Sequence, residues 1–168
     1  MGKAKRASRG RIPASEESSA QKTALQMGIA RHKQGELGEL AFLCKATSLG
    51  FAPSLPYGQM HRYDFVVDSG RNLWRVQVKT GRTVVDGLYH VCIHRSRNWR
   101  VHAYTEAEID FVAVYIIPEE TWYILPVREV AERQAMLFRP RGHPRRDPYA
   151  HYREAWHLLR QPDGLVFG

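Results

Sequence analysis

A turn followed by a strictly alternating segment is the feature that most limits how this chain can fold. Residues 69–72 read Ser-Gly-Arg-Asn, which is typical of a tight turn. Residues 63–68 before the turn and 73–80 after it have the composition of strands, so the segment predicts a β-hairpin. The second strand has one apolar and one polar face. These faces carry Trp74, Val76 and Val78 on one side, and Arg75, Gln77 and Lys79 on the other.

The register of this hairpin brings three functional groups together. A two-residue or four-residue loop centred on Gly70 and Arg71 places Asp64 directly opposite Gln77, with Cβ atoms about 5 Å apart. Lys79 lies two residues further along the same face. Carboxylate and amide oxygens suit a hard cation such as Mg²⁺, completed by water and a substrate phosphate. Such a pair is also common on an ordinary solvated surface, so the spacing alone does not decide between the two interpretations.

Residues 21–48 are expected to be helical. An apolar stripe at helical spacing would face the core, and it consists of Leu37, Leu40, Ala41, Cys44 and Ser48. Gly35 and Gly38 weaken the middle of the segment, so two helices meeting near residues 34–35 are an alternative. Gly50 is a suitable residue to end the helix.

The rest of the chain predicts further strands and then closing helices. Strands are expected at residues 88–94, 111–117 and 122–125, and helices at 127–134 and 149–159. Residues 111–117 are almost continuously apolar, as in a strand that is buried on both faces. We therefore expect an α/β (α+β) fold: one domain with a mixed β-sheet of about five strands flanked by helices. In the last helix, the spacing of Tyr149, Tyr152 and Trp156 favours core packing over base stacking.

The charge of the chain favours a polyanionic partner. Lys and Arg number 25 against 17 Asp and Glu, which gives a net charge of +8 and points chiefly to nucleic acid. Residues 1–19 predict a disordered basic arm, serving either phosphate attraction or solubility, and residues 20–168 the folded domain. No apolar run approaches the length of a membrane span, and no apolar stretch follows the basic N-terminus as in a secretory signal. We therefore expect a cytoplasmic location and no membrane partner.

Two other kinds of site can be weighed on spacing. Cys44 and Cys92 have no Cys-x-x-Cys partner, which excludes a zinc ribbon. His90, Cys92 and His94 alternate on one strand face, but no fourth ligand lies close by in the sequence. A plain sheet face or a DNA contact is the favoured interpretation of these three residues. The basic loop at residues 139–146 is either a phosphate grip or a solvated loop.

Several short motifs together resemble the PD-(D/E)XK nuclease superfamily. They read Gly-Glu-Leu-Gly-Glu at 35–39, Arg-Tyr-Asp at 62–64, Val-Gln-Val-Lys-Thr at 76–80, and Asp-Phe-Val-Ala at 110–113 with Trp-Tyr at 122–123. The sequence is most similar to the branch with glutamine in place of the second acidic residue, found in some group I intron homing endonucleases and related bacterial proteins. The resemblance covers residues 35–126 and implies a restriction-endonuclease-like core.

What the resemblance implies is a metal-dependent DNA endonuclease. Asp64 would be the principal ligand of Mg²⁺ or Mn²⁺, joined by the side-chain oxygen of Gln77 and the backbone carbonyl of Val78. Lys79 would position or activate the attacking water. Glu39 matches the family's Gly-x-x-x-Glu and would supply the carboxylate of the helix. The helical wheel instead places Glu36 closer to the apolar stripe, so Glu36 stays a second candidate, as a ligand of a second metal.

The sequence departs from the family pattern at three positions. Tyr63 stands where the family has proline, Gln34 precedes Gly35 where it has lysine, and Gln77 leaves one negative charge fewer at the metal.

Two alternatives to a nuclease remain: a catalytically degenerate nuclease fold that only binds nucleic acid, and a structural protein with incidental charge. The intact set of Asp64, Gln77 and Lys79 favours the enzyme. A homodimer would supply the two active sites that double-strand cleavage requires.

Overall fold

The computed structural model describes residues 14–58, 60–97, 100–141 and 143–160. It divides into two units, Met1–Gln34 and Gly35–Gly168, and the second unit holds the sheets and the candidate site. Helix α1 (Ala14–Ser48) is continuous through the boundary, so the alternative of two helices meeting near residues 34–35 is wrong. The helix also begins inside the range expected to be a disordered arm, because residues 14–19 are helical. Residues 1–13 of that arm lie outside the described residues.

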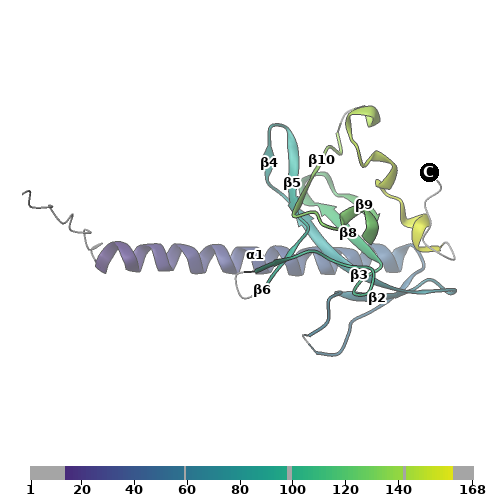
Figure 1. Ribbon diagram of the computed structural model, residues 1–168, viewed down its shortest axis with the longest axis horizontal. Coiled ribbons are helices and arrows are strands. Elements are labelled where there is room, and N and C mark those ends of the chain that lie inside the picture. The colour runs from purple at the N-terminus through teal and green to yellow at the C-terminus, as the bar shows by residue number, and fades with distance from the viewer. Residues whose placement is uncertain (1–13, 59, 98–99, 142, 161–168) are drawn as a thin grey trace, which may run out of the picture. The chain divides into compact units, whose positions relative to one another are not determined.

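A mixed five-stranded sheet forms the centre of the second unit, as predicted (Figure 1). Its strands, in spatial order, are β1 (Ala52–Ser54), β2 (Phe65–Asp68), β3 (Leu73–Gly81), β8 (Phe111–Ile116) and β9 (Thr121–Pro126). Strands β3 and β8 pair in parallel and the other neighbours pair antiparallel. Residues 111–114 of β8 are fully buried, as the continuous apolar run predicts for a central strand.

The hairpin of β2 and β3 has the predicted register. Phe65 pairs with Val76, and Val67 pairs with Trp74, which is symmetric about the Gly70–Arg71 turn. Gly70 adopts a positive φ of 82°, and its N–H donates to the Asp68 carboxylate at 2.7 Å. Val76 is buried and Gln77 half-buried, so the predicted alternation between an apolar and a polar face is confirmed.

A second sheet contains the strand expected at residues 88–94. Strand β5 (Leu88–Cys92) pairs with β4 (Val84–Val85) and β10 (Ala135–Phe138), not with the main sheet. The β4–β5 turn has positive φ at Asp86 and Gly87 and is the turquoise hairpin that stands apart from the main sheet in Figure 1. The short strands β6 (Arg95–Arg97) and β7 (Arg100–His102) form a further pair.

The two closing helices expected from the sequence are largely absent in the described part of the chain. Only α2 (Val127–Val130) forms at the first, because the chain turns at Glu132 with a φ of +64° and then pairs as β10. Met136 and Phe138 are buried with the period of a strand. The segment expected to form the second helix instead contains short 3-10 helices, η3 (Ala150–Tyr152) and η4 (Trp156–Arg160), preceded by η2 (Pro144–Arg146). A further 3-10 helix, η1 (Ile117–Glu119), joins β8 to β9.

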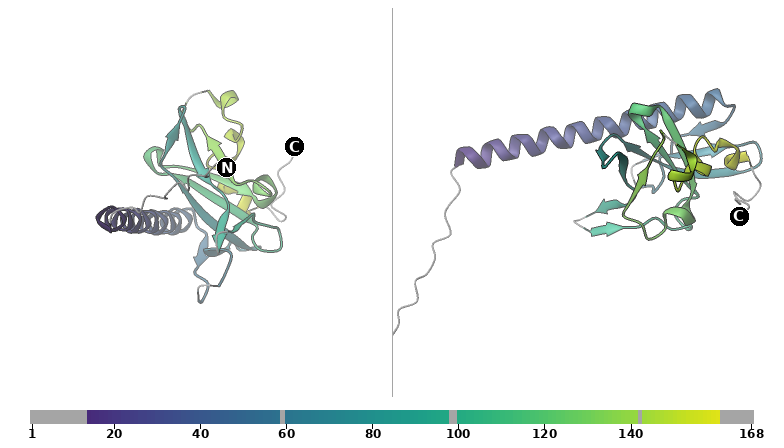
Figure 2. Two further views of the ribbon diagram at one scale, coloured as in Figure 1. Left: turned by 60° about the vertical axis from the view of Figure 1, so that its left-hand side comes forward. Right: turned by 90° about the horizontal axis from the view of Figure 1, so that it is seen from above.

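These C-terminal turns nevertheless pack as predicted. Tyr152 and Trp156 are buried, and Tyr149 is partly buried against the core. The segment, yellow in Figure 2, lies beside the C-terminal end of α1. The guanidinium of Arg160 donates to the carbonyl of Leu49 and lies 4.5 Å from the Phe51 ring centroid. Residue Glu154 has a φ of +51°, which interrupts the helix expected over residues 149–159.

The face that α1 buries in the second unit differs from the predicted stripe. Leu37 and Leu40 are 51% and 61% exposed, whereas Gly38, Phe42 and Ala46 are buried. The cause is close approach at Gly38, where an added Cβ would lie 2.3 Å from the Thr80 Cγ2 atom. The helix backbone therefore contacts β3, and the Phe42 ring packs on Phe65 with centroids 5.0 Å apart.

No helix within the described ranges is both long and apolar enough to cross a membrane.

Candidate active site

The site lies at the start of β2, where the longer strand β3 continues past it. The last backbone bond between them runs from the Asp64 N–H to the Val76 carbonyl, at 2.9 Å, while β3 continues to Gly81. Beyond this bond the Asp64 side chain replaces the backbone as the partner of β3: its Oδ2 atom accepts the backbone N–H of Val78 at 2.8 Å. N–H and C=O groups of one strand residue point to the same side, so the Val78 carbonyl points toward Asp64 as well.

The amide of Gln77 lies between two oxygen atoms. Its Nε2 donates to Asp64 Oδ2 at 2.5 Å and contacts the Val78 carbonyl oxygen at 3.3 Å. Asp64 and Gln77 therefore lie side by side, as the hairpin register predicts, with the backbone of Val78 next to them. Rotating the amide by 180° about its last bond would present its oxygen to the same place.

A cavity of about 270 Å³ opens at Asp64 and includes one of the two helix carboxylates. Its lining residues come from α1, the β1–β2 loop and the start of β2: Glu39, Leu55, Pro56, Gly58, His61, Tyr63 and Asp64. A neighbouring cavity of about 290 Å³ is lined by both Glu36 and Glu39 but not by Asp64. Glu39 follows the buried Gly38 and is half-buried, whereas Glu36 is exposed. The geometry thus brings Glu39, rather than Glu36, toward Asp64.

Lys79 extends from the same face of β3 and meets a residue that the sequence patterns did not single out. Its Nζ atom lies 5.3 Å from the ring centroid of Tyr104, within the range of a cation–π contact. Tyr104 is 3% exposed and precedes the turn that leads into β8. His61, in the wall of the Asp64 cavity, was likewise missed, because neither residue belongs to a motif or shares a strand with one.

Burial controls the electrostatics of the site. Desolvation raises the pKa of Asp64, and three groups oppose this shift: the Val78 N–H, the charge of Lys79 and the Gln77 side chain. Burial also raises the pKa of Tyr104, which keeps its hydroxyl group neutral, while the charge of Lys79 and its side-chain hydrogen bond to Tyr104 oppose the shift. An ionised Asp64 is thus poorly solvated and would gain from a cation held nearby.

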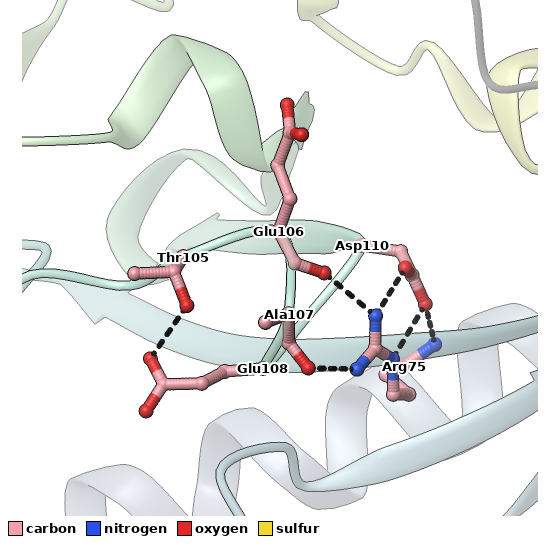
Figure 3. A network of polar contacts seen from close by, with 6 residues as sticks. All are labelled: Arg75, Thr105, Glu106, Ala107, Glu108 and Asp110. Carbon is pink, nitrogen blue, oxygen red and sulfur yellow. Dashed lines mark hydrogen bonds and ion pairs between the residues drawn. The ribbon is translucent and has the colours of Figure 1, made fainter.

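Arg75, the first polar residue on this face of β3, serves as a clamp (Figure 3). Its backbone N–H and Nε donate to Asp110 Oδ2 at 2.7 and 3.1 Å, and a terminal nitrogen donates to Oδ1 at 2.8 Å. The guanidinium also donates to the carbonyls of Glu106 and Ala107, at 2.9 and 2.5 Å. These bonds fix the segment that follows Tyr104 onto the strand that carries Lys79.

The donor atoms at Asp64 fit a hard divalent cation. Carboxylate, amide and backbone carbonyl oxygens are ligands that Mg²⁺ accepts, with several waters retained. Across the ranges that the structure describes, no three His, Cys, Asp or Glu side chains cluster as a metal site, and this includes His90, Cys92 and His94. A cation at Asp64 would therefore depend on few protein carboxylates and on the neutral oxygens of Gln77 and Val78.

Comparison with known proteins identifies the class of fold. A model of the PD-(D/E)XK endonuclease family matches residues 29–159, and the chain belongs to this family. The family acts on nucleic acid and typically uses divalent metal ions.

A solved structure shares this fold. The bacterial homing endonuclease I-Ssp6803I is 28% identical, with a TM-score of 0.70, over 77% of this chain and 93% of that one. No curated protein sequence matches the chain.

Proposed function

We propose that this protein is a metal-dependent DNA endonuclease that hydrolyses phosphodiester bonds. The observation that carries the proposal is the convergence of the Asp64 carboxylate, the Gln77 amide and the Val78 carbonyl, with Lys79 on the same strand face. Family membership supports nuclease chemistry. DNA as the substrate is supported by the similarity to a homing endonuclease and by the net charge of +8.

Asp64, Gln77 and Val78 are the proposed ligands of Mg²⁺ or Mn²⁺. For Gln77 this requires the amide to turn its oxygen toward the cation, which would replace the hydrogen bond that its nitrogen makes to Asp64. A bound cation would polarise the scissile phosphate and lower the pKa of a coordinated water. Glu39 is the proposed additional carboxylate, since it lines the same cavity as Asp64.

Lys79 is the proposed partner of the attacking water. Its ammonium would orient the water by hydrogen bonding and offset the negative charge that develops at phosphorus. Hydrolysis then forms a bond from the water oxygen to phosphorus and breaks one P–O ester bond. The displaced oxygen leaves as an alcohol with one proton, and the other product end carries the phosphate. Because the ammonium acts mainly in the transition state, its loss should lower kcat more than DNA affinity.

The test is a cleavage assay on plasmid, linear and branched DNA with Mg²⁺, with Mn²⁺ and with EDTA. Wild type should cleave with metal and not with EDTA, and Lys79→Ala should lose roughly 10²–10⁴-fold in rate. Lys45→Ala is the charge-matched control, because Lys45 lies outside the site and forms an ion pair with Glu154, with 3.6 Å between the two charged groups. It should cleave like wild type. If wild type and Lys79→Ala are equally inactive on every DNA form and metal, the degenerate binding fold is the better account.

A further inference from the structure

Tyr104 is a buried tyrosine whose ring faces the proposed catalytic lysine. It lies 25 positions after Lys79 in the chain, outside every motif that resembles the family. Its ring centroid is 5.3 Å from the Lys79 Nζ atom, and its side chain is among the buried core residues. The ring is therefore fixed by packing, whereas the Lys79 ammonium is carried on a flexible chain of four carbons. A rigid group thus lies beside a flexible one.

The position of Tyr104 is set by the same strand that carries Lys79. Arg75 binds Asp110 through both carboxylate oxygens and also binds the carbonyls of residues 106 and 107, as Figure 3 shows. The turn closes on itself, since the N–H groups of Glu108 and Ile109 donate to the Thr105 carbonyl at 3.0 and 3.1 Å. Arg62 adds an ion pair to Glu108 at 3.4 Å. The turn that begins at Thr105 is therefore held at both ends.

An aromatic face suits an ammonium that has to act on water. It attracts the cation through its quadrupole but does not take up strong hydrogen bonds as a carboxylate would. A lysine ammonium carries three N–H donors, so its contact with Tyr104 leaves donors for a water molecule and a phosphate oxygen. Without the ring, the buried carboxylate of Asp64, whose charge is needed for a metal ion, would attract the ammonium.

We propose that Tyr104 is a positioning residue that holds the Lys79 ammonium beside Asp64 in the orientation required to bind the attacking water. This rests on the proposed nuclease function, and Tyr104 itself touches neither metal nor substrate in the proposal. The role is assigned to the face of the ring, which Tyr104→Phe keeps, and not to the hydroxyl group, although that group also interacts with Lys79 through a side-chain hydrogen bond. Tyr104→Phe should therefore preserve it, whereas side chains without a ring should not.

The first test measures placement and does not depend on activity. In NMR spectra of protein labelled with ¹³C at the lysine ε carbon, the ε protons of Lys79 should show an upfield ring-current shift. The Lys79 signal is assigned as the one that disappears in Lys79→Arg. Tyr104→Phe should keep the shift, and Tyr104→Leu should abolish it. Tyr104→Met has a longer, flexible side chain without a ring, so it serves as a second ringless variant if the leucine variant unfolds. An unshifted Lys79 signal in wild type would overturn the proposal at once.

The second test separates positioning from general stability. Tyr104→Leu should lower kcat by roughly 3- to 30-fold with unchanged KM, as the size of a cation–π contact allows. Tyr104→Phe should stay within about 2-fold of wild type. In a Lys79→Ala background, Tyr104→Leu should cost nothing further, because the group it positions is gone. An equal loss in both backgrounds, or equal loss in the phenylalanine and leucine variants, would contradict the proposal. A shifted Lys79 signal in a wild type that cleaves no DNA would instead contradict the proposed function.

Discussion

The carboxylate of Asp64 accepts the backbone N–H of Val78 at 2.8 Å, just before strand β2 begins and where β3 continues past it. The side chain therefore completes a sheet edge and lines the candidate site at the same time. This double role explains why an acidic group is held in a place where burial raises its pKa. It also means that Asp64 should influence both stability and metal binding.

Asp64→Asn should raise the melting temperature of the metal-free protein at neutral pH. A carboxyl group whose pKa is raised by folding costs stability when ionised, and the cost vanishes once the pH falls below its unfolded value. The gain from Asp64→Asn should therefore be present at neutral pH and shrink as the pH falls through the raised pKa. Thermal unfolding as a function of pH measures this.

Added Mg²⁺ should reverse the order of the melting temperatures of wild type and Asp64→Asn. A ligand that binds only the folded state raises its stability, so wild type should gain and Asp64→Asn should not. The exposed Asp86→Asn is the control for loss of a carboxylate, because asparagine tolerates the positive φ of that turn. A wild type that is indifferent to Mg²⁺ and to Mn²⁺ would argue against a metal at Asp64.

Gln77→Glu should make the site more dependent on metal. The substitution sets a second carboxylate against Asp64, where the Gln77 nitrogen now lies 2.5 Å from Oδ2. Like charges at this distance repel, so the metal-free variant should melt below wild type at neutral pH. Mg²⁺ should bind more tightly than to wild type, because one more negative ligand faces the cation.

Calorimetric titration of Gln77→Glu with Mg²⁺, beside wild type and Gln77→Leu, measures this order. The leucine variant should bind metal most weakly, since it lacks any side-chain oxygen. Equal affinities in all three proteins would mean that residue 77 is not a ligand.

The hairpin and its site could be predicted from the sequence because they depend on local rules. Turn residues around Gly70 and a period of two along β3 were enough to place Gln77 beside Asp64. The face of α1 could not be read in this way, because apolar spacing favoured Leu37 and Leu40. A close contact of the Gly38 backbone with the Thr80 side chain decides that face, and glycine gives no signal of it in a hydropathy pattern.

Contacts distant in the chain account for the other errors. Residues 135–138 pair with β5, more than forty positions earlier, and the helix expected over residues 127–134 stops early because the chain turns at Glu132 to reach this pairing. Tyr104 reaches Lys79 only because Arg75 holds the intervening turn. Neither relationship leaves a periodic pattern in the sequence.

The two helix carboxylates offer a matched pair of substitutions. Glu39→Gln should lower cleavage by about tenfold or more and weaken Mg²⁺ binding, because Glu39 lines the cavity of Asp64. Glu36→Gln should leave both within about 2-fold, because Glu36 lines only the neighbouring cavity. Both variants remove one charge from the same helix, three residues apart, so nonspecific charge effects on DNA binding cancel. A larger loss in Glu36→Gln than in Glu39→Gln would reverse the assignment.

Gly38→Ala should damage both the fold and the site, through a contact that can be relieved. An alanine Cβ at this position would lie 2.3 Å from Thr80 Cγ2, so α1 or β3 has to move, at a cost on the order of 1–3 kcal/mol. Glu39 follows directly in the helix, and any displacement carries its carboxylate away from Asp64. Cleavage per folded molecule should therefore fall as well, which loss of stability alone would not cause.

Thr80→Ser is the compensating change, because serine keeps the hydroxyl group and lacks Cγ2. The remaining neighbours of the new Cβ would be Val78 Cγ1 and residue 80 Cβ, which lie 3.6 and 3.8 Å away and are ordinary contacts. The double variant should thus recover most of the lost unfolding free energy and cleavage, as measured by urea denaturation and by initial rates. Gly35→Ala is the control: apart from the neighbouring residues of the helix itself, no atom lies within 4 Å of its added Cβ, so it should stabilise the helix by about 0.5–1 kcal/mol. If Thr80→Ser fails to rescue Gly38→Ala, the close contact of α1 with β3 does not determine the position of the helix, and the placement of Glu39 beside Asp64 loses its physical basis.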